Sequence, residues 1–146
     1  MKMRYIKLNS AAKTPTYGSA RAAGADLYAC TGGETVTFAP GETKLIHTGI
    51  ALEIPEGYVG LIYARSGIAT KRGLAPANKV GVIDSDYRGE IMVSLFNQSG
   101  EEQQIEDGER IAQLVITPYL SVSFEEAGEL TDTARGESGF GSTGRQ

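Results

Sequence analysis

Short apolar runs, each bounded by turn residues, extend along most of this 146-residue chain and limit the folds it can adopt. Residues 46–54 alternate between apolar and polar or small side chains, and residues 58–63 are almost continuously apolar. Further short runs lie at 91–96, 111–116 and 120–124. No long stretch shows helical periodicity. The pattern predicts an all-β fold, a jelly-roll-like barrel or sandwich.

One short helix is predicted at residues 66–72. Ser66 is a candidate N-cap, Lys71 and Arg72 supply positive charge to the last turn, and Gly73 follows the end. The sequence Arg65-Ser66-Gly67 places a guanidinium, a hydroxyl and a glycine at the helix start, a composition suited to phosphate. From these residues alone, an ordinary capped turn is the simpler interpretation.

The composition excludes several classes of protein. A single domain is expected at this length. One cysteine, Cys30, and one histidine, His47, leave neither a disulfide framework nor a dedicated zinc site. A net charge of −4 argues against broad binding to duplex nucleic acid. No apolar stretch has the length of a membrane span and the first residues do not resemble a signal peptide, so we expect a cytoplasmic protein.

Residues 81–90 place acidic, tyrosine and arginine side chains between two strand-like runs. Val80, Val82 and Ile83 form a run that should enter the core, so Asp84 is expected where buried sheet meets a cleft. A carboxylate in that position can act as a general base. A polar hairpin whose aspartates bond their own backbone fits these residues equally well.

The composition changes at residue 131, after which glycine and polar residues dominate and Phe140 is the single large apolar side chain. This segment cannot form a core, and a flexible tail without a function is the simplest interpretation. Phe140 could instead stack on a ligand, with Arg135, Ser142 and Thr143 as anion contacts. The lysine of a P-loop is missing.

Five segments in order resemble the five motifs of the trimeric dUTP diphosphatase (dUTPase) family. Two positions depart from the family pattern: Ala64 stands where the family often has proline or glycine, and Ser138 stands where it usually has glycine. Neither replaces a residue expected to contact the substrate. The segments are Ala23-Gly24-Ala25-Asp26-Leu27-Tyr28-Ala29, Ala64-Arg65-Ser66-Gly67-Ile68-Ala69, Gly81 to Glu90, Gly108-Glu109-Arg110-Ile111-Ala112-Gln113-Leu114, and Arg135 to Gly144.

The resemblance implies hydrolysis of dUTP to dUMP and diphosphate by a jelly-roll homotrimer. Residues 1–146 would form one dUTPase-like domain in which 131–146 are a C-terminal arm that closes a neighbouring subunit's active site. Each of three sites would draw residues from all three chains. No nucleic acid or membrane partner is implied.

The resemblance also assigns roles to individual residues. Asp84 would activate the attacking water, and Tyr87 would pack on the deoxyribose. Asp26 would lie in the outer coordination shell of Mg²⁺ and contact the ion through water. The remaining predicted substrate contacts, to base, phosphates and the closing arm, are Arg65, Ser66, Gly67, Asn78, Gly81, Val82, Ile83, Met92, Gln113, Arg135, Phe140, Gly141, Ser142 and Thr143. Asp86, Arg88, Glu90 and Arg110 are expected to be scaffold or subunit contacts.

Three alternatives remain at this stage. A dCTP deaminase, or a bifunctional relative, shares the fold but uses a different acid–base arrangement near the base. A non-catalytic binding protein could keep the fold and lose turnover, although Asp84, Tyr87, Arg135 and Phe140 argue against decay. A β-sandwich interaction module without a ligand leaves the five segments unexplained.

Overall fold

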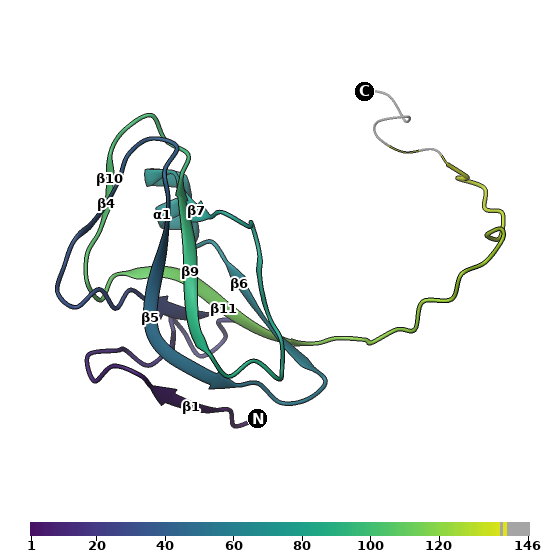
Figure 1. The fold of residues 1–146 in the computed structure, drawn as a ribbon, viewed down its shortest axis with the longest axis horizontal. Helices are drawn as coiled ribbons and strands as arrows, with labels where there is room; N and C mark the ends of the chain where they lie inside the picture. The colour runs from purple at the N-terminus through teal and green to yellow at the C-terminus, as the bar shows by residue number, and fades with distance from the viewer. Residues whose placement is uncertain (138, 140–146) are drawn as a thin grey trace.

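The computed structural model describes residues 1–137 and 139, in which strands dominate and one helix is present (Figure 1). The elements are β1 (Arg4–Lys7), β2 (Thr16–Tyr17), β3 (Ala25–Tyr28), β4 (Val36–Phe38), β5 (Thr43–Glu53), β6 (Tyr58–Tyr63), α1 (Ser66–Arg72), β7 (Leu74–Pro76), β8 (Gly81–Ile83), β9 (Glu90–Asn97), β10 (Gln103–Ile105) and β11 (Arg110–Pro118).

The strands form two larger sheets and a separate pair. One sheet has the order β1-β5-β9-β7, the other has the order β2-β3-β11-β6-β8, and β4 pairs with β10. All of these strand pairs are antiparallel, and strands adjacent in a sheet are mostly distant in sequence. This arrangement confirms the predicted all-β, jelly-roll-like fold.

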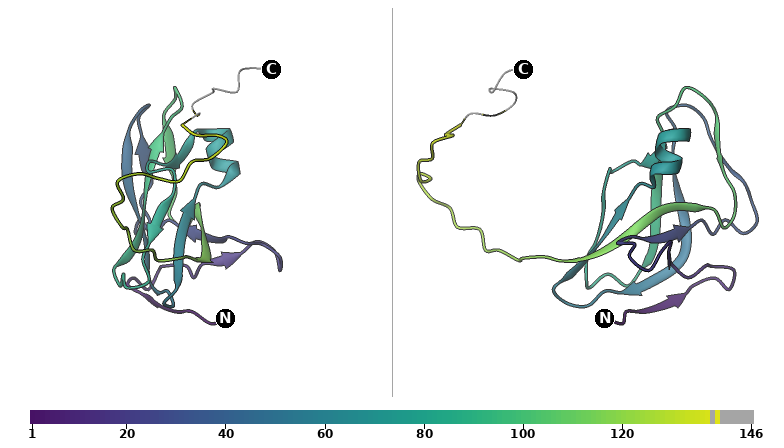
Figure 2. Two further views of the ribbon diagram at one scale, coloured as in Figure 1. Left: turned by 90° about the vertical axis from the view of Figure 1, so that its right-hand side faces the viewer. Right: turned by 180° about the vertical axis from the view of Figure 1, so that it is seen from behind.

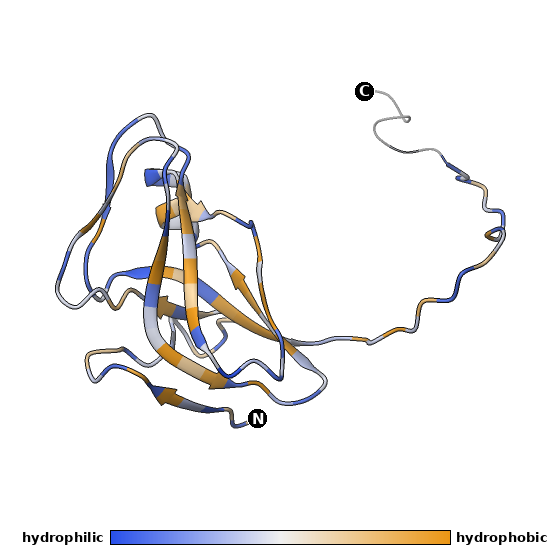
Figure 3. Cartoon of the chain, viewed as in Figure 1, coloured by the Kyte–Doolittle hydropathy of each residue, from blue (hydrophilic) through white to orange (hydrophobic). Residues whose placement is uncertain are grey.

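The core lies between the two larger sheets (Figures 1 and 2). In β9 the side chains alternate between buried and half-buried positions, with Ile91, Val93 and Leu95 at most 2% exposed. Apolar residues concentrate on the strands and hydrophilic ones in the connections (Figure 3). The alternation that predicted strands therefore results from one face of each strand packing inward.

The strand predicted at residues 120–124 is wrong for this chain. After β11 the described segment 119–137 has no strand or helix and extends away from the two sheets (Figures 1 and 2). Leu120, Val122 and Phe124 are 90, 66 and 96% exposed. Their alternation satisfies the pattern of a strand, but a strand also needs a hydrogen-bonding neighbour, and none of the described residues pairs with this segment.

Helix α1 has the predicted bounds, but Ser66 is not its N-cap. The cap is Arg65, which has an extended backbone and makes no side-chain capping bond, because a guanidinium can only donate and cannot accept from the N–H groups at the helix start. The guanidinium donates instead to Asp26. The end is as predicted: Gly73 adopts φ +67°, a left-handed conformation that glycine tolerates. No helix in the described part of the chain is long and apolar enough to cross a membrane.

Candidate active site

The turn between β8 and β9 carries Asp84 and borders a cavity of about 280 Å³. The cavity combines apolar side chains with two carboxylates and a tyrosine, which suits an apolar ring carrying a polar substituent. Five of its seven lining residues are predicted site residues. The lining consists of Leu45, Val82, Ile83, Asp84, Tyr87, Glu90 and Met92.

Asp84 is exposed and lies between two hollows. Besides the smaller cavity, it lines a larger one of about 750 Å³ with charged residues of β1 and of the loop after β5. In that larger cavity Arg4 donates to Glu53, and this hydrogen bond lowers the pKa of the Glu53 carboxyl. The carboxylate of Asp84 is thus placed at the mouth of the smaller cavity, in reach of solvent.

The expectation that Val82 enters the core is wrong. Val82 is 61% exposed, whereas Ile83 is half-buried and packs against the core. The reason is the period of two in a strand: neighbouring side chains point to opposite faces, so only one of the two can face inward. Val82 therefore contributes to the cavity.

Strand β8 is an edge strand, paired with β6 and with no second neighbour in the described sheet. Backbone N–H and C=O groups on its outer side are free to bind a ligand. The tight turn before β8 contains Asn78, which is exposed, and Lys79, which has φ +67°. A side chain on Gly81 would come within 3.6 Å of the Asn78 amide nitrogen, so these two predicted residues are close together.

The ring of Tyr87 is fixed within its own turn. Its hydroxyl donates to the backbone oxygen of Glu90 at 3.0 Å. A Cβ added at Gly89 would lie 2.5 Å from Cζ of Tyr87, so the ring lies directly across this glycine. Arg88 donates to the backbone oxygens of Ser85 and Tyr87 at 2.6 and 3.0 Å. These bonds agree with the scaffold role predicted for Arg88.

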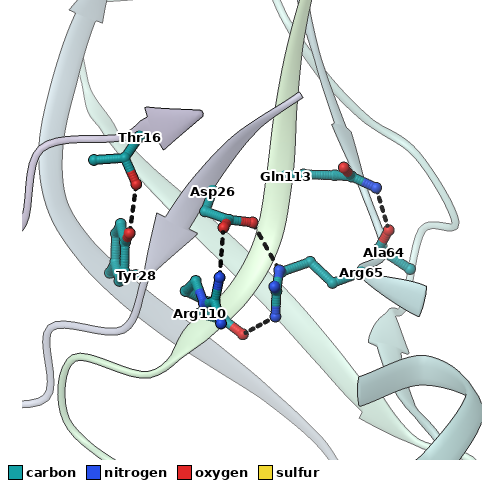
Figure 4. Close-up of polar contacts among 7 residues, drawn as sticks. All are labelled: Thr16, Asp26, Tyr28, Ala64, Arg65, Arg110 and Gln113. Atoms are coloured by element: carbon teal, nitrogen blue, oxygen red, sulfur yellow. Dashed lines mark hydrogen bonds and ion pairs between the residues drawn. The ribbon is translucent and has the colours of Figure 1, made fainter. Parts of the chain in front are cut away.

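A second cluster joins three of the predicted segments around Asp26 (Figure 4). Asp26 on β3 is 8% exposed, and its Oδ1 accepts from Nε of Arg65 at 2.7 Å. Its Oδ2 accepts from Arg110 on β11 at 3.2 Å. Two guanidinium groups around one carboxylate leave an excess of one positive charge. The cluster is therefore electrostatically suited to an anion.

Gln113 lies beside this cluster, facing the connection between β6 and α1 (Figure 4). Its side-chain amide donates to the backbone oxygen of Ala64 at 2.9 Å. A Cβ added at Gly24 would lie 2.7 Å from its Oε1, so a larger residue at this position would have to displace the amide. In this chain Gln113 thus holds the backbone that presents Arg65, and its second N–H remains able to donate.

The strand register separates the two clusters. Ile83 pairs with Gly60 at one end of β6, which places Asp84 opposite Val59, whereas Gln113 and Asp26 are aligned with Tyr63 at the other end. The offset is four residues along the strands and three strand spacings across the sheet. It amounts to about 19 Å between Asp84 and Asp26.

Comparison with known proteins identifies the family of this chain. A family model described as dUTPase matches residues 10–144. The chain belongs to the dUTPase family. It is 50% identical over 145 residues to a deoxyuridine 5'-triphosphate nucleotidohydrolase of Nautilia profundicola, with 99% of this chain and 100% of the relative covered.

Two solved structures of the dUTPase family resemble the chain. A dUTPase of Staphylococcus bacteriophage 80alpha, solved with dUpNHpp, superposes with a TM-score of 0.89 at 31% identity, covering 99% of both chains. A dUTPase of phage phi11 of S. aureus, described with a structural Mg(II) ion, gives a TM-score of 0.79 at 29% identity, covering 88% of this chain and 98% of the phage chain.

The last dUTPase-like segment is largely beyond what the structure describes. Arg135 is exposed on the extended segment and lines none of the three cavities found in the described part of the chain. Phe140, Gly141, Ser142 and Thr143 lie outside the described residues, as does Ser138. Ser66 and Gly67 are exposed at the start of α1.

Two residues of the smaller cavity were not predicted from the sequence. Leu45 belongs to β5, far from every dUTPase-like segment, and lines the cavity only because β5 pairs with β9. Glu90 was expected to be scaffold, and its side chain lies at the cavity wall. Its position on the same face of β9 as Met92 was the available signal, since residues two apart on a strand share a face.

Proposed function

We propose that this protein hydrolyses dUTP to dUMP and diphosphate by attack of water on the α-phosphorus. The reaction would supply dUMP for thymidylate synthesis and keep uracil out of DNA. The observation that carries the proposal is the cavity beside Asp84, found in a chain whose family and whose relative in Nautilia profundicola are named for this substrate. We further propose that it acts in the cytoplasm, where free nucleotides are available.

Asp84 is proposed as the general base. A base must lie within hydrogen-bonding reach of the water that it deprotonates, and Asp84 is exposed at the cavity mouth. The chain needs no covalent nucleophile, because phosphoryl transfer depends mainly on positioning and on neutralisation of charge. Mg²⁺ bound to the triphosphate would supply part of that neutralisation.

Uracil is proposed to bind against the edge strand β8. Backbone groups of Gly81, Val82 and Ile83 on that strand, with the Asn78 amide, would bond its polar edge, and Met92 would pack on its ring. Tyr87 would lie against the deoxyribose where a ribose hydroxyl would clash. The hydrogen bond of the Tyr87 hydroxyl to the Glu90 backbone supports this role, because a ring held in place can exclude the 2′-hydroxyl of a ribose.

The phosphates are proposed to bind at the second cluster. Arg65, with Ser66 and Gly67 at the start of α1, would contact them, and Gln113 would donate its second N–H. The excess positive charge around Asp26 supports this assignment. The arm would add the remaining contacts, with Phe140 over the base. Its phosphate contacts are assigned to Arg135, Gly141, Ser142 and Thr143.

The described residues fit Mg²⁺ as an outer-shell ion. No group of three or more His, Cys, Asp or Glu side chains in the described part of the chain could hold a metal. Both oxygens of Asp26 accept bonds from arginines, yet each carboxylate oxygen can accept a second bond. Asp26 can therefore bind a water of a hydrated Mg²⁺, an ion that usually keeps several waters.

We propose that the active site is completed between chains of a homotrimer, with residues 131–146 as the closing arm. The separation of about 19 Å between Asp84 and Asp26 supports this, since a general base and a metal-bound water each act over roughly 3 Å. One chain cannot present both groups to one α-phosphate. The extended segment 119–137, which leaves its own sheets, is consistent with an arm that reaches a neighbour.

The test of the catalytic assignment compares Asp84→Asn with Asp86→Asn, a matched change in the same turn that lines only the larger cavity. Asp84→Asn should lower kcat for diphosphate release from dUTP by at least about 100-fold while dUpNHpp still binds. Asp86→Asn should stay near the parent. Near-normal turnover in Asp84→Asn would refute the assignment. Ammonia release from dCTP, measured alongside, should be absent.

The shared site can be tested by mixing two inactive chains. One is Asp84→Asn with an intact arm, and the other keeps Asp84 but ends before Arg135. Coexpressed trimers should recover roughly a quarter of the parental activity, because that share of sites combines an intact Asp84 with a neighbour's arm. No recovery, from mixed trimers confirmed by mass, would mean that each arm serves its own chain.

A further inference from the structure

Glu90 follows the turn that carries Asp84, and its side chain bonds the end of this turn to the neighbouring strand β5. Its Oε1 accepts the backbone N–H of Gly49 at 2.7 Å, and its Oε2 lies 2.8 Å from Nδ1 of His47. The carboxylate is mostly enclosed, with 20% of the side chain exposed. Both partners belong to β5, so the bonds cross from the start of β9 to the middle of another strand.

The bonds close a bulge in the β5–β9 ladder. The register shifts between the pairs His47–Met92 and Ala51–Glu90, so three residues of β5 face one residue of β9. Gly49 within the bulge has φ +67°. A bulge of this kind interrupts the backbone ladder and redirects the strand. Within the bulge, the Glu90 carboxylate accepts the backbone N–H of Gly49, which has no partner in the β5–β9 backbone ladder.

Tyr87 depends on the position of the Glu90 backbone. Its hydroxyl donates to the Glu90 carbonyl oxygen, and its ring crosses Gly89, the residue before it. The side-chain bonds of Glu90 to Gly49 and His47 add to its backbone pairing with Ala51 in holding that carbonyl relative to β5. A continuous set of contacts thus runs from the β5 bulge, through Glu90, to the hydroxyl of Tyr87.

We propose that Glu90 is a positioning residue for the selection of deoxyribose over ribose. The inference rests on the proposed function, in which Tyr87 packs against the sugar. dUTP and UTP differ by one hydroxyl, so exclusion of UTP requires the tyrosine ring to stay close to that position. If the start of β9 can move away from β5, the ring moves with it and the hydroxyl is accommodated.

The chemistry of Glu90 predicts which substitutions keep this role. In Glu90→Gln the amide oxygen can still accept from Gly49 and the amide nitrogen can still bond His47, so the negative charge is not needed. Glu90→Asp keeps the charge but is one methylene shorter, about 1.5 Å, and cannot reach both partners. Glu90→Ala removes both bonds and leaves the N–H of Gly49 without its acceptor.

Glu42 provides a matched control. One of its oxygens accepts a backbone N–H, from Ala39 at 2.8 Å, and the other pairs with a cation, Lys44 at 3.3 Å. Glu42, like Glu90, thus bonds a backbone N–H with one oxygen and a side-chain nitrogen with the other, and it lines none of the three cavities found in the described residues. Glu42→Ala removes equivalent bonds away from the sugar.

The experiment measures kcat/KM for dUTP and for UTP with magnesium and the full chain. Glu90→Ala and Glu90→Asp should lower the dUTP/UTP ratio by at least about tenfold, mainly through a gain of UTP turnover. Glu90→Gln and Glu42→Ala should stay within about threefold of the parent. If Glu90→Ala does not fold, Glu90→Asp carries the test. An unchanged ratio in Glu90→Asp would overturn the inference.

Tyr87→Ala separates the two ways in which the inference can fail. If the parent does not turn over dUTP, or if Tyr87→Ala keeps the full dUTP/UTP ratio, the proposed function or its sugar contact is wrong. If Tyr87→Ala loses the ratio and Glu90→Asp keeps it, Tyr87 selects the sugar without help from Glu90. A loss in both, with retention in Glu90→Gln, supports the positioning role.

Discussion

Replacing Asp26 with Asn should destabilise the protein because it removes the shared partner of two arginines. Oδ1 and Oδ2 of Asp26 bind Arg65 and Arg110 at 2.7 and 3.2 Å. The side chain of Asp26 is 12% exposed and that of Arg65 is 24% exposed, so water replaces this partner poorly. Asparagine has the same shape but offers one acceptor oxygen and no charge.

The magnitude follows from the burial of each partner. Removal of one member of a fully buried ion pair costs about 3–5 kcal/mol. Here Arg110 is 51% exposed and recovers hydration, so its bond contributes little. Arg65 supplies most of the effect, and we expect a loss of about 2 kcal/mol in the free energy of unfolding. For a chain of this size the melting temperature should fall by roughly 6 °C.

Thermal unfolding at one fixed protein concentration measures the effect, since assembly would couple stability to concentration. Glu53→Gln is the matched control: it weakens the pair with Arg4, whose side chain is 83% exposed, and should leave the melting temperature close to that of the parent because water screens this pair. If the melting temperature of Asp26→Asn equals that of Glu53→Gln or of the parent, the cluster is held by packing rather than by charge, and the reasoning fails.

Three further outcomes are expected, each measured by thermal unfolding. Lys79→Gly should stabilise by about 0.5–1 kcal/mol, since lysine is held at φ +67°; a lower melting temperature would contradict this. Gly73→Ala should destabilise by about 1–3 kcal/mol, because a Cβ would lie 2.9 Å from that of Ser99 at a left-handed φ, and a neutral result would mean that the loop yields freely. The hydrogen bond from the Thr31 backbone lowers the pKa of Asp107 in the folded protein. The stabilisation that ionised Asp107 provides should therefore be full above the unfolded pKa of about 3.9 and be lost as the pH falls through the lower pKa of the folded protein. Asp107→Asn should therefore be less stable at pH 6 and approach the parent in acid, whereas a gap independent of pH would refute the linkage.

The strands that the sequence predicted are those whose pattern is set by packing against their own chain. Residues 58–63 form β6 with the predicted bounds, and the alternation at 91–96 matches the buried face of β9. The same rule failed at 120–124, where the alternating side chains pack on no sheet formed by residues 1–137. The short strands β2, β4 and β10 carried too few residues for a period to be recognised.

The site was predictable where a motif is local and not where the fold joins distant segments. The residues from 82 to 87 that border the cavity lie in one short stretch, the end of β8 and the turn after it, so their sequence already groups them. The place of Leu45 in the cavity and the bonds of Glu90 to β5 both result from the pairing of β5 with β9, strands about forty residues apart in sequence. The bulge in that pairing cannot be predicted from a local sequence pattern. The pairing of Asp26 with both arginines likewise depends on which strands become neighbours.

The register of β6 gives a physical reason for catalysis to depend on assembly. The Asp26 cluster forms within one chain: both arginines bond Asp26, and no neighbour is needed to hold Arg65 in place. The cavity beside Asp84 is equally formed by one chain, from β5, β8 and β9. About 19 Å of sheet separates them, and antiparallel pairing at both edges of β6 fixes that distance. Under the proposed function, each chain therefore brings a base-binding half-site and a phosphate-binding half-site that cannot serve the same nucleotide. Folding alone yields the parts, and only contact between chains can place an α-phosphate beside both.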